Sequence, residues 1–485
     1  MTLKLYDQKR IALEREEVLF VVEEVDGNGK PSYGTLAEPA GTDAVYPTGP
    51  VSFRQGYTKR DNKEVHNSRG KRKPITGRLP HGKFTVPLYV KPYGTAGIAP
   101  VPSKLLDGLF CNPHVSRAAD TVQAVPAPTA TTFEPGTPAN FAAGQPVLVQ
   151  IGTHYELRKI LSIAGGEITV DTAFSAAPAS GAIIPAAVGY AFADNELSYT
   201  VWRKEGHSVI VYTGCAVDDI SGYKITGNDD VSATFGGGYQ REIKCGTDEL
   251  GADMPSAIST TVTVLDGRKF DIGARFNLSD GTNTETKLIV TNKALNAGAG
   301  PSNPYLTDLT VTRGTGAQAW TAANGIDVYP WLPTDVNSGI IVQGRNGLCE
   351  INGISTSILS LELGLKNNIN WHEDEVTSTG TPWVASFALA KMRDITAKLQ
   401  VYFRQQHLGL FEDAHQGTAE EIRHAAYETD VDGNPLPGTI IYTALPQLEF
   451  KTPDIGAKET ERVLDIDSLP YESSAMNDEM TMWFL

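Results

Sequence analysis

Two segments far apart in the chain show strict alternation of apolar and polar residues. They are residues 83–91 and residues 395–404. Because the side chains of a β-strand point alternately to its two faces, each segment is predicted to be a strand with one face in a core and the other in water. The core-facing positions are Phe84, Val86, Leu88 and Val90 in the first segment and Ile395, Ala397, Leu399, Val401 and Phe403 in the second.

A helix is predicted after each of these strands. Residues 103–110 form the first candidate and residues 418–427 the second, in which Thr418 and Glu421 have the spacing of a capping box. Two hairpin tips with a shared Val-Asp-Gly-Asn sequence, residues 25–28 and 431–434, also repeat. So does a set of apolar positions that starts at Ile220, Tyr223 and Ile225 and again at Ile358, Leu361 and Leu363. The chain is therefore predicted to contain two related halves.

A second repeat is expected inside these halves. The segments 141–149, 167–170 and 181–185 resemble 270–278, 308–311 and 325–330, and both sets have the pattern of a small β module. The Ala/Pro/Thr-rich stretch 124–143 precedes the first module as a linker. The predicted divisions are residues 1–125 with 194–258 for the first half, 126–193 for the first insert, 259–333 for the second insert and 334–485 for the second half.

Composition favours a mainly β fold in more than one domain. The 485 residues include 47 glycines and 29 prolines, a density of turn formers that fits β structure, and the length exceeds what one core usually serves. The formal net charge of −16 disfavours a general nucleic-acid binder, because phosphate contacts require clustered lysine and arginine.

Neither the cysteines nor the hydropathy pattern predicts a special environment. The four cysteines, Cys111, Cys215, Cys245 and Cys349, have no zinc-ligand spacing and no disulfide framework, so reduced and partly buried thiols are expected. The first residues lack the apolar stretch of a signal peptide, and no window approaches the roughly 18 apolar residues of a membrane span. Synthesis and folding in the cytoplasm are expected.

These segments resemble the major tail tube proteins of bacteriophages with long, non-contractile tails, in particular those with two tube domains in one chain. The resemblance covers most of the chain outside the two inserts. In the first half it rests on Gly49-Pro50, residues 56–60, the strand 84–90 with Lys91-Pro92-Tyr93, and the helix 105–110. In the second half it rests on residues 394–404, 418–427, 440–450 and 461–466.

The resemblance implies two tube-type β-sandwich domains, each with a flanking helix, whose strands join between subunits into a barrel around a DNA channel. Three chains would then close a homotrimeric ring with sixfold pseudo-symmetry, whereas one tube domain per chain would require a hexamer. It further implies stacked rings in the virion tail, assembly in the host cytoplasm, contacts with a tape measure protein and tail-end proteins, and transient, non-specific passage of double-stranded DNA. No cofactor and no membrane insertion are implied, and the inserts are expected on the exterior.

A basic stretch in the first half has three possible roles. It contains Lys59, Arg60, Lys63, Arg69, Lys71, Arg72 and Lys73. The resemblance implies an arm that reaches the neighbouring ring, where it would meet acidic residues such as 373–375 or the pair Asp229 and Asp230. A solvated loop and a nucleic-acid patch are the alternatives.

The polar faces of the two alternating strands are the candidate channel lining. They carry Thr85, Tyr89, Thr396, Lys398, Gln400 and Tyr402. A lysine on such a face requires a carboxylate nearby, because an unpaired positive charge would hold passing DNA.

No catalytic, cofactor or metal site is predicted. Asp430 opens a segment that resembles a calcium loop, yet Ile441 stands where a bidentate glutamate is needed, so a turn is preferred. Glu421 and His424 lie three apart on the predicted helix and are interpreted as a solvated pair. The alternatives to a tube subunit are another phage structural or decorating protein, such as a capsid-decorating or tail-terminator subunit, a secreted β-rich adhesin or carbohydrate-binding protein, and a β-sandwich hydrolase.

Overall fold

The computed structural model describes residues 17–56, 59–60, 73, 75–76, 79–336, 338–373, 384, 386–458, 461–473 and 476–485. In this part of the chain the fold is mainly β, which confirms the predicted class. Two α-helices are present among the described residues, α2 (Ser103–Phe110) and α3 (Gly409–Gln416).

Most strands belong to two copies of one arrangement. Copy 1 contains β1 (Val18–Glu23), β2 (Ala44–Val45), β3 (Ser52–Arg54), β6 (Gly82–Tyr89), β15 (Tyr199–Glu205), β16 (Ser208–Thr226), β17 (Ser232–Tyr239) and β18 (Arg241–Cys245). Copy 2 contains β25 (Gly347–Ile351), β26 (Ile354–Ser355), β27 (Ile358–Lys366), β30 (Asp394–Tyr402), β31 (Glu420–Ala426), β32 (Ile441–Phe450), β34 (Glu461–Pro470) and β35 (Thr481–Phe484).

The two copies pair their strands in the same order. Antiparallel pairs link β2–β1–β15–β16–β17–β6–β3 in copy 1, with β18 also on β16. In copy 2 they link β26–β25–β31–β32–β34–β30–β27, with β35 also on β32. The helix lies at the same point of each copy, α2 after β6 and α3 after β30. The pairing therefore repeats element by element along the chain.

A long strand passes between two layers in each copy. In copy 1 the start of β16 pairs with β15 and β18, and its end pairs with β17. Gly214 lies at the change of layer with a φ of 64°, and a Cβ there would come within 2.7–3.0 Å of Gln240 and Tyr33. In copy 2, β32 and the following β33 (Asp454–Lys458) pair successively with β34 and so extend in the same way.

We call β1, β2, β15 and β18, and their counterparts β25, β26, β31 and β35, the back layers. The other strands form one continuous front sheet in the order β3–β6–β17–β16–β27–β30–β34–β33. The two copies meet in this sheet through β16 and β27, with Ile225 opposite Leu361 and Asp219 opposite Lys366. This joint makes the two copies one body.

Two small modules also share one topology. Module 1 contains β8 (Asp120–Thr121), β9 (Thr132–Phe133), the 3-10 helix η2 (Pro138–Asn140), β10 (Pro146–Ile151), β11 (His154–Ala164), β12 (Glu167–Val170) and β13 (Ile183–Ile184). Module 2 contains β19 (Asp248–Glu249), β20 (Thr261–Val264), η3 (Gly267–Lys269), β21 (Arg275–Ser279), β22 (Thr284–Leu295), β23 (Thr307–Thr312), η4 (Ala322–Asn324) and β24 (Asp327–Pro330).

The pairs β8–β13, β9–β12, β10–β11 and β11–β12 of module 1 recur as β19–β24, β20–β23, β21–β22 and β22–β23 of module 2. One bulge also matches, at Leu161 in β11 and at Thr291 in β22, whereas the register shift between β21 and β22 has no counterpart in module 1. The first strand of each module, β8 and β19, begins before the predicted boundary of its insert. Each has two residues and therefore carries no periodic signal.

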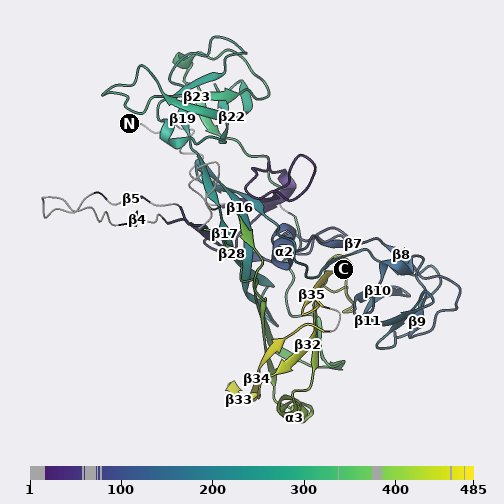
Figure 1. Ribbon diagram of the computed structural model, residues 1–485. Coiled ribbons are helices and arrows are strands. Elements are labelled where there is room, and N and C mark those ends of the chain that lie inside the picture. Colours follow the sequence, from purple (N-terminus) through teal and green to yellow (C-terminus); the bar gives the residue numbers. More distant parts are fainter. Residues whose placement is uncertain are drawn as a thin grey trace, which may run out of the picture.

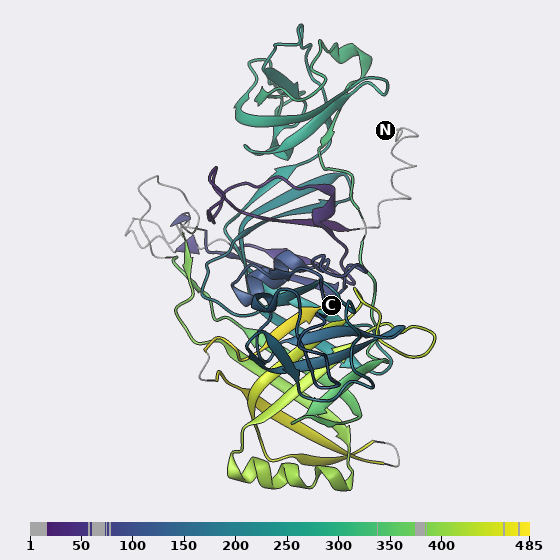
Figure 2. The same cartoon turned by 90° about the vertical axis from the view of Figure 1, so that its right-hand side faces the viewer.

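The modules occupy different places on the molecule. Figure 1 shows the front sheet nearly edge-on, with module 2 (β19, β22, β23) beyond one end and module 1 (β8–β11) on the side of α2. In Figure 2 the view is from that side, with module 1 in front of the sheet and α3 at the end away from module 2. The remaining described strands are β4 (Lys59–Arg60), β5 (Ile75–Thr76), β7 (Val115–Arg117), β14 (Ala187–Tyr190), β28 (Asn370–Trp371) and β29 (Phe387–Ala388), and the remaining 3-10 helices are η1 (Gly41–Asp43) and η5 (Gln405–His407).

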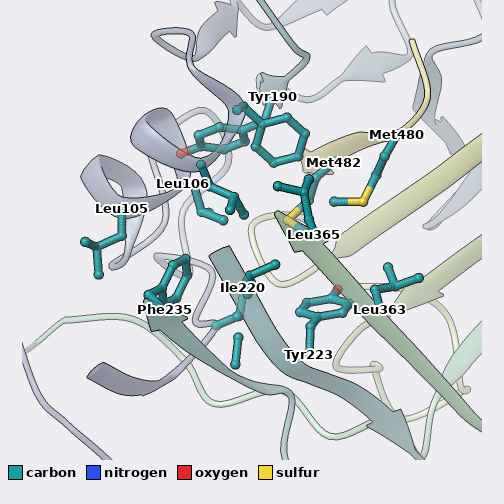
Figure 3. Close-up of a cluster of buried hydrophobic side chains, with 14 of the residues drawn as sticks. Leu105, Leu106, Tyr190, Ile220, Tyr223, Phe235, Leu363, Leu365, Met480 and Met482 are labelled. Atoms are coloured by element: carbon teal, nitrogen blue, oxygen red, sulfur yellow. The ribbon is translucent and has the colours of Figure 1, made fainter. Parts of the chain in front are cut away.

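The main core lies between the front sheet and the back layers and runs through both copies. Leu105 and Leu106 of α2 point toward Ile220 and Phe235 of the front sheet, and Leu363 and Leu365 continue the same core across the joint (Figure 3). Burial of these side chains supplies the main stabilisation of the two-copy body.

The second predicted helix is wrong. Residues 420–426 form β31, which pairs with β25 and β32, and the helix of copy 2 lies earlier, at α3. Gly417, with a φ of 63°, ends α3 directly before Thr418, so the expected capping box does not form a helix start. Glu421 and His424 thus lie on a strand, where residues three apart point to opposite faces.

The two other repeats in the sequence do not match equivalent parts of the copies. Both hairpin tips are turns, closed by Asp26 and Asp430, but one follows β1 and the other joins β31 to β32. The segments that begin at Ile220 and Ile358 are neighbouring antiparallel strands across the joint. The duplication is real in the pairing order, whereas these local matches reflect the common pattern of β-strands.

Candidate assembly surfaces

One face of the front sheet is open and polar. Along β6 and β30 every second side chain is buried in the core, and the side chains between them are exposed or half-buried. The six predicted lining residues all lie on this open face, namely Thr85, Tyr89, Thr396, Lys398, Gln400 and Tyr402. The strands β17, β16 and β27 separate the two sets, so the lining residues form two clusters on one surface.

Carboxylates accompany Lys398 on this face. Its Nζ lies 3.6 Å from Asp467 Oδ1 on β34, and Glu362 of β27 is its register partner on the other side. Next to it, Gln400 donates a hydrogen bond of 2.7 Å to Asp465. The neutralising groups that the lysine requires are therefore present.

The open face balances its charges across strands. Lys224 of β16 and Glu362 of β27 form an ion pair of 2.5 Å that spans the joint. Among the described side chains that strand register places on this face, carboxylates outnumber cationic groups: the charged residues are Asp219, Glu362, Asp394, Asp454, Glu461, Asp465, Asp467, Arg54, Lys83, Lys224, Lys366 and Lys398. Partial burial and the neighbouring Asp218 raise the pKa of the Asp219 carboxyl. Lys366 acts in the opposite direction, and the net effect is a raised pKa. Sequence reasoning missed the β34 carboxylates, although the alternation of Leu464, Ile466 and Ser468 with acidic residues carries the signal.

The front sheet has two edges without a strand partner among the described residues. β3 pairs with β6 on one side, and β33 pairs with β34 on one side. Ile455 of β33 points toward the core side of the sheet and is 45% exposed. By contrast, Ile225 near the corresponding end of β16 is 1% exposed, because β27 covers it.

These two edges are complementary by the internal repeat. At the internal joint, copy 2 contributes β27 and copy 1 contributes β16. The counterpart of β27 in copy 1 is β3, and the counterpart of β16 in copy 2 is β32 together with β33. The strands at the two open edges are therefore the counterparts of the strands that pair at the internal joint.

The basic stretch lies between β3 and β6. Its described parts are the paired strands β4 and β5, on the side of the front sheet away from α2 (Figure 1), and Lys73. Lys59 and Lys73 are exposed, and Arg60 lies in β4, with its side chain outside the described part. The other predicted contact residues, Lys63, Arg69, Lys71 and Arg72, lie outside the described residues.

Of the acidic counterparts considered for this stretch, Glu373 and the pair Asp229 and Asp230 lie at opposite ends of β6, and residues 374 and 375 lie outside the described part. Glu373 lies where the basic stretch joins β6. There it contacts the backbone N–H and the ring of His81, and this ring stacks on Trp371 with 4.8 Å between ring centroids. Asp229 and Asp230 lie in the turn before β17, at the other end of β6, since Ser232 pairs with Tyr89. Asp229 and Asp230 are therefore the counterparts that lie far from the basic stretch within one chain.

Potential chemical sites in the described residues have structural explanations. No group of three or more histidine, cysteine or acidic side chains there is arranged to hold a metal ion. His424 is buried in copy 2, and burial lowers its pKa to about 4. All four cysteines are buried free thiols, and burial raises the pKa of Cys111 and of Cys349 to about 12. Asp430 uses its carboxylate to accept bonds from the backbone of its own turn.

Searches against known proteins add no family to these surfaces. No helix among the described residues is long and apolar enough to cross a membrane. No protein-family model matches the chain, and no curated protein matches it.

Proposed function

We propose that this chain is the subunit of a bacteriophage tail tube, in which chains join edge to edge into rings and the rings stack around a DNA channel. The observation that carries the proposal is the complementarity of the two open edges, β33 and β3. A contact between two different patches of the same chain is head-to-tail, and it closes into a ring when the rotation per subunit allows closure. Closure also removes the exposed strand edges, which would otherwise favour aggregation.

The internal joint supplies the geometry for this assembly. If β33 and β3 pair between chains as β16 and β27 pair within one, each ring position is occupied by one copy. Three chains then give six equivalent positions. The front sheet becomes a closed barrel, and its open polar face is the wall of the channel.

The character of that face supports a conduit for DNA. A balanced surface with an excess of carboxylates repels the phosphate backbone and gives a passing duplex no strong binding site. The basic stretch between β3 and β6 contacts the acidic turn at Asp229 and Asp230 in the adjacent ring in this proposal. An adhesin remains the alternative only for the modules, and glycan binding without self-assembly would favour it.

The test uses Ile455→Asp in the full chain. The side chain is exposed in the isolated subunit, so folding should be unchanged, whereas in a ring it would place a charge where Ile225 is buried at the internal joint. Negative-stain electron microscopy and sedimentation velocity should show hollow rings or tubes for the natural chain and monomers for the variant. Val431→Asp, at a fully exposed hairpin tip, is the matched control and should assemble normally. A natural chain that stays a compact monomer under all assembly conditions would contradict the proposal.

A further inference from the structure

The edge of the back layer in copy 2 is covered by the two strands that flank module 1, β14 and β7. Its last strand, β35, pairs on its outer side with β14, with Gly189 opposite Trp483 and Val188 opposite Phe484. β14 in turn pairs with β7. These two strands lead into and out of module 1, so the segments that join module 1 to copy 1 extend the back layer of copy 2 by two strands.

Module 1 holds these strands in place through its own contacts with copy 2. The Arg117 guanidinium of β7 lies 4.7 Å from the Phe141 ring and 5.4 Å from the Trp483 ring, and it donates to the Pro146 carbonyl. Asp171 pairs with the buried Arg423 of β31. Lys159 of module 1 also pairs with Glu421, and Leu148 and Leu157 share a core with Tyr442 and Trp483.

Module 2 covers the corresponding edge of copy 1. β18 is the counterpart of β35, and the outward N–H and C=O of Lys244 on β18 are both taken by Asp271. The Lys244 N–H donates to the Asp271 carboxylate at 3.0 Å, and the Asp271 N–H donates to the Lys244 carbonyl at 2.9 Å. Gly246 continues this pairing by donating to the Lys269 carbonyl.

Module 2 is also fixed to copy 1 by packing. Arg275 of β21 lies 5.4 Å from the ring of Trp202 and donates a bond of 2.9 Å to Glu38. Trp331 packs edge-on against Trp202, with 6.1 Å between ring centroids. The module and the back layer of copy 1 form one continuous core.

We propose that the two modules act as caps on corresponding edges of the two back layers, so that chains of this protein pair with one another through the front sheet alone. An unpaired strand edge is a template for a further strand, and proteins blunt such edges with very short strands or cover them. The opposite ends of the back layers are the two-residue strands β2 and β26. Among the described strands of the front sheet and the back layers, β3 and β33 are then the edges that neither a module nor a two-residue strand blocks.

This inference rests on the proposed function in one respect, that chains associate edge to edge. It assigns both modules a role in directing that association, in addition to any exterior role. Because module 1 covers an edge that ends in Trp483 and Phe484, its cap protects the more apolar of the two edges.

The test removes, in the full chain, the contacts that hold module 2 on the edge of β18. Asp271→Pro removes both bonds to Lys244, and Arg275→Ala in the same chain removes the anchor on Trp202 and Glu38. Asp271→Ala, which keeps the backbone bond, is the milder variant. Asp280→Ala, in an exposed turn of module 2 where the carboxylate caps its own loop, is the control.

The readouts are sedimentation velocity and negative-stain electron microscopy. We expect the double variant to form laterally joined or irregular particles under conditions where the natural chain and Asp280→Ala give uniform rings, with Asp271→Ala in between. Uniform rings from Asp271→Ala and from a folded double variant would overturn the cap role. If the natural chain forms no rings, the proposed function fails, and the cap role is then decided by whether the variants self-associate more than the natural monomer.

Discussion

One buried histidine in the core of copy 2 contributes to how the fold responds to acid. His424 on β31 lies between Cys349 of β25 and Thr443 of β32, neither of which carries a charge at neutral pH. Its Nδ1 is buried without a hydrogen-bond partner in the described structure. Protonation of this ring would place an uncompensated charge in the core, so the folded state favours the neutral form.

The predicted consequence is a loss of stability between neutral and mildly acidic pH. The pKa of His424 falls from 6.5 to about 4 on folding, so the unfolded chain binds the additional proton. The neutral His424 ring contributes fully to the free energy of unfolding above pH 6.5, and this contribution declines as pH falls toward 4. The total loss below both pKa values is about 3 kcal/mol. The raised pKa values of Glu24, Glu350 and Glu420 act in the opposite direction, so the slope is measured as the difference in urea unfolding between the natural chain and a variant without this histidine, at a series of pH values.

The natural comparison is His424→Leu, which keeps the volume and removes the titration. This variant should show a flatter dependence of unfolding free energy on pH over the same range, and His415→Gln on the exposed face of α3 should not. An unchanged slope in His424→Leu would show that other groups dominate the response to acid.

At the same scale, the surface residues show what the sequence could predict of the candidate site. The alternation of β6 and β30 placed six residues on the open face, since period-two patterning is local. Their ionic partners could not be predicted, because Asp467 and Glu362 reach Lys398 through strand pairings that no local pattern defines. The need for a carboxylate was predictable, whereas its identity was not.

Among the elements, the two helices differ in how firmly they are held. α2 buries Leu105, Leu106, Leu109 and Phe110 in the shared core. α3, in the corresponding position of copy 2, buries Leu410 alone of its eight residues. Helices draw most of their stability in proteins from such packing.

We therefore predict that α3 opens more readily than α2. Hydrogen–deuterium exchange followed by mass spectrometry should show faster exchange for peptides covering residues 409–416 than for those covering 103–110. Leu106→Ala should cost about 2–5 kcal/mol of stability, because it leaves a cavity in the core. Equal protection of the two helices would contradict the prediction.

The misassigned helix shows the limit of element prediction from pattern. Ile422, Ala425 and Ala426 fit a helical stripe, yet all three are buried because β31 has a neighbour on each edge and is covered on both faces. A strand buried on both faces has no alternation to read. Tertiary position therefore decided an assignment that local pattern could not.

For the molecule as a whole, the two kinds of joint differ in strength. Within a chain, the copies meet in the front sheet through β16–β27, and β14, which leads from module 1 back to copy 1, adds a second joint by pairing with β35 at the back. Between chains, the proposed β33–β3 joint has the front sheet alone, because module 2 occupies the edge of β18. The internal joint should therefore be the stronger.

This difference predicts the order of disassembly. With rising urea, rings should separate into folded monomers before the copies within a chain lose their contact. Light scattering would report the first step and tryptophan fluorescence the second, and the two midpoints should be distinct. A single coincident transition would show that ring contacts and the internal joint have similar strength.

The complementary edges also allow the number of subunits in a ring to be counted without an image. An Ile455→Asp chain retains a normal β3 edge, so it can bind one natural chain through that edge. Its own β33 edge cannot bind the next chain, so in mixtures the variant terminates ring assembly. If every ring needs three natural chains, the yield of closed rings should fall as the cube of the natural fraction, and as the sixth power if six are needed. Measuring the yield of closed rings at a series of ratios of natural to Ile455→Asp chain therefore gives the number of chains in a ring.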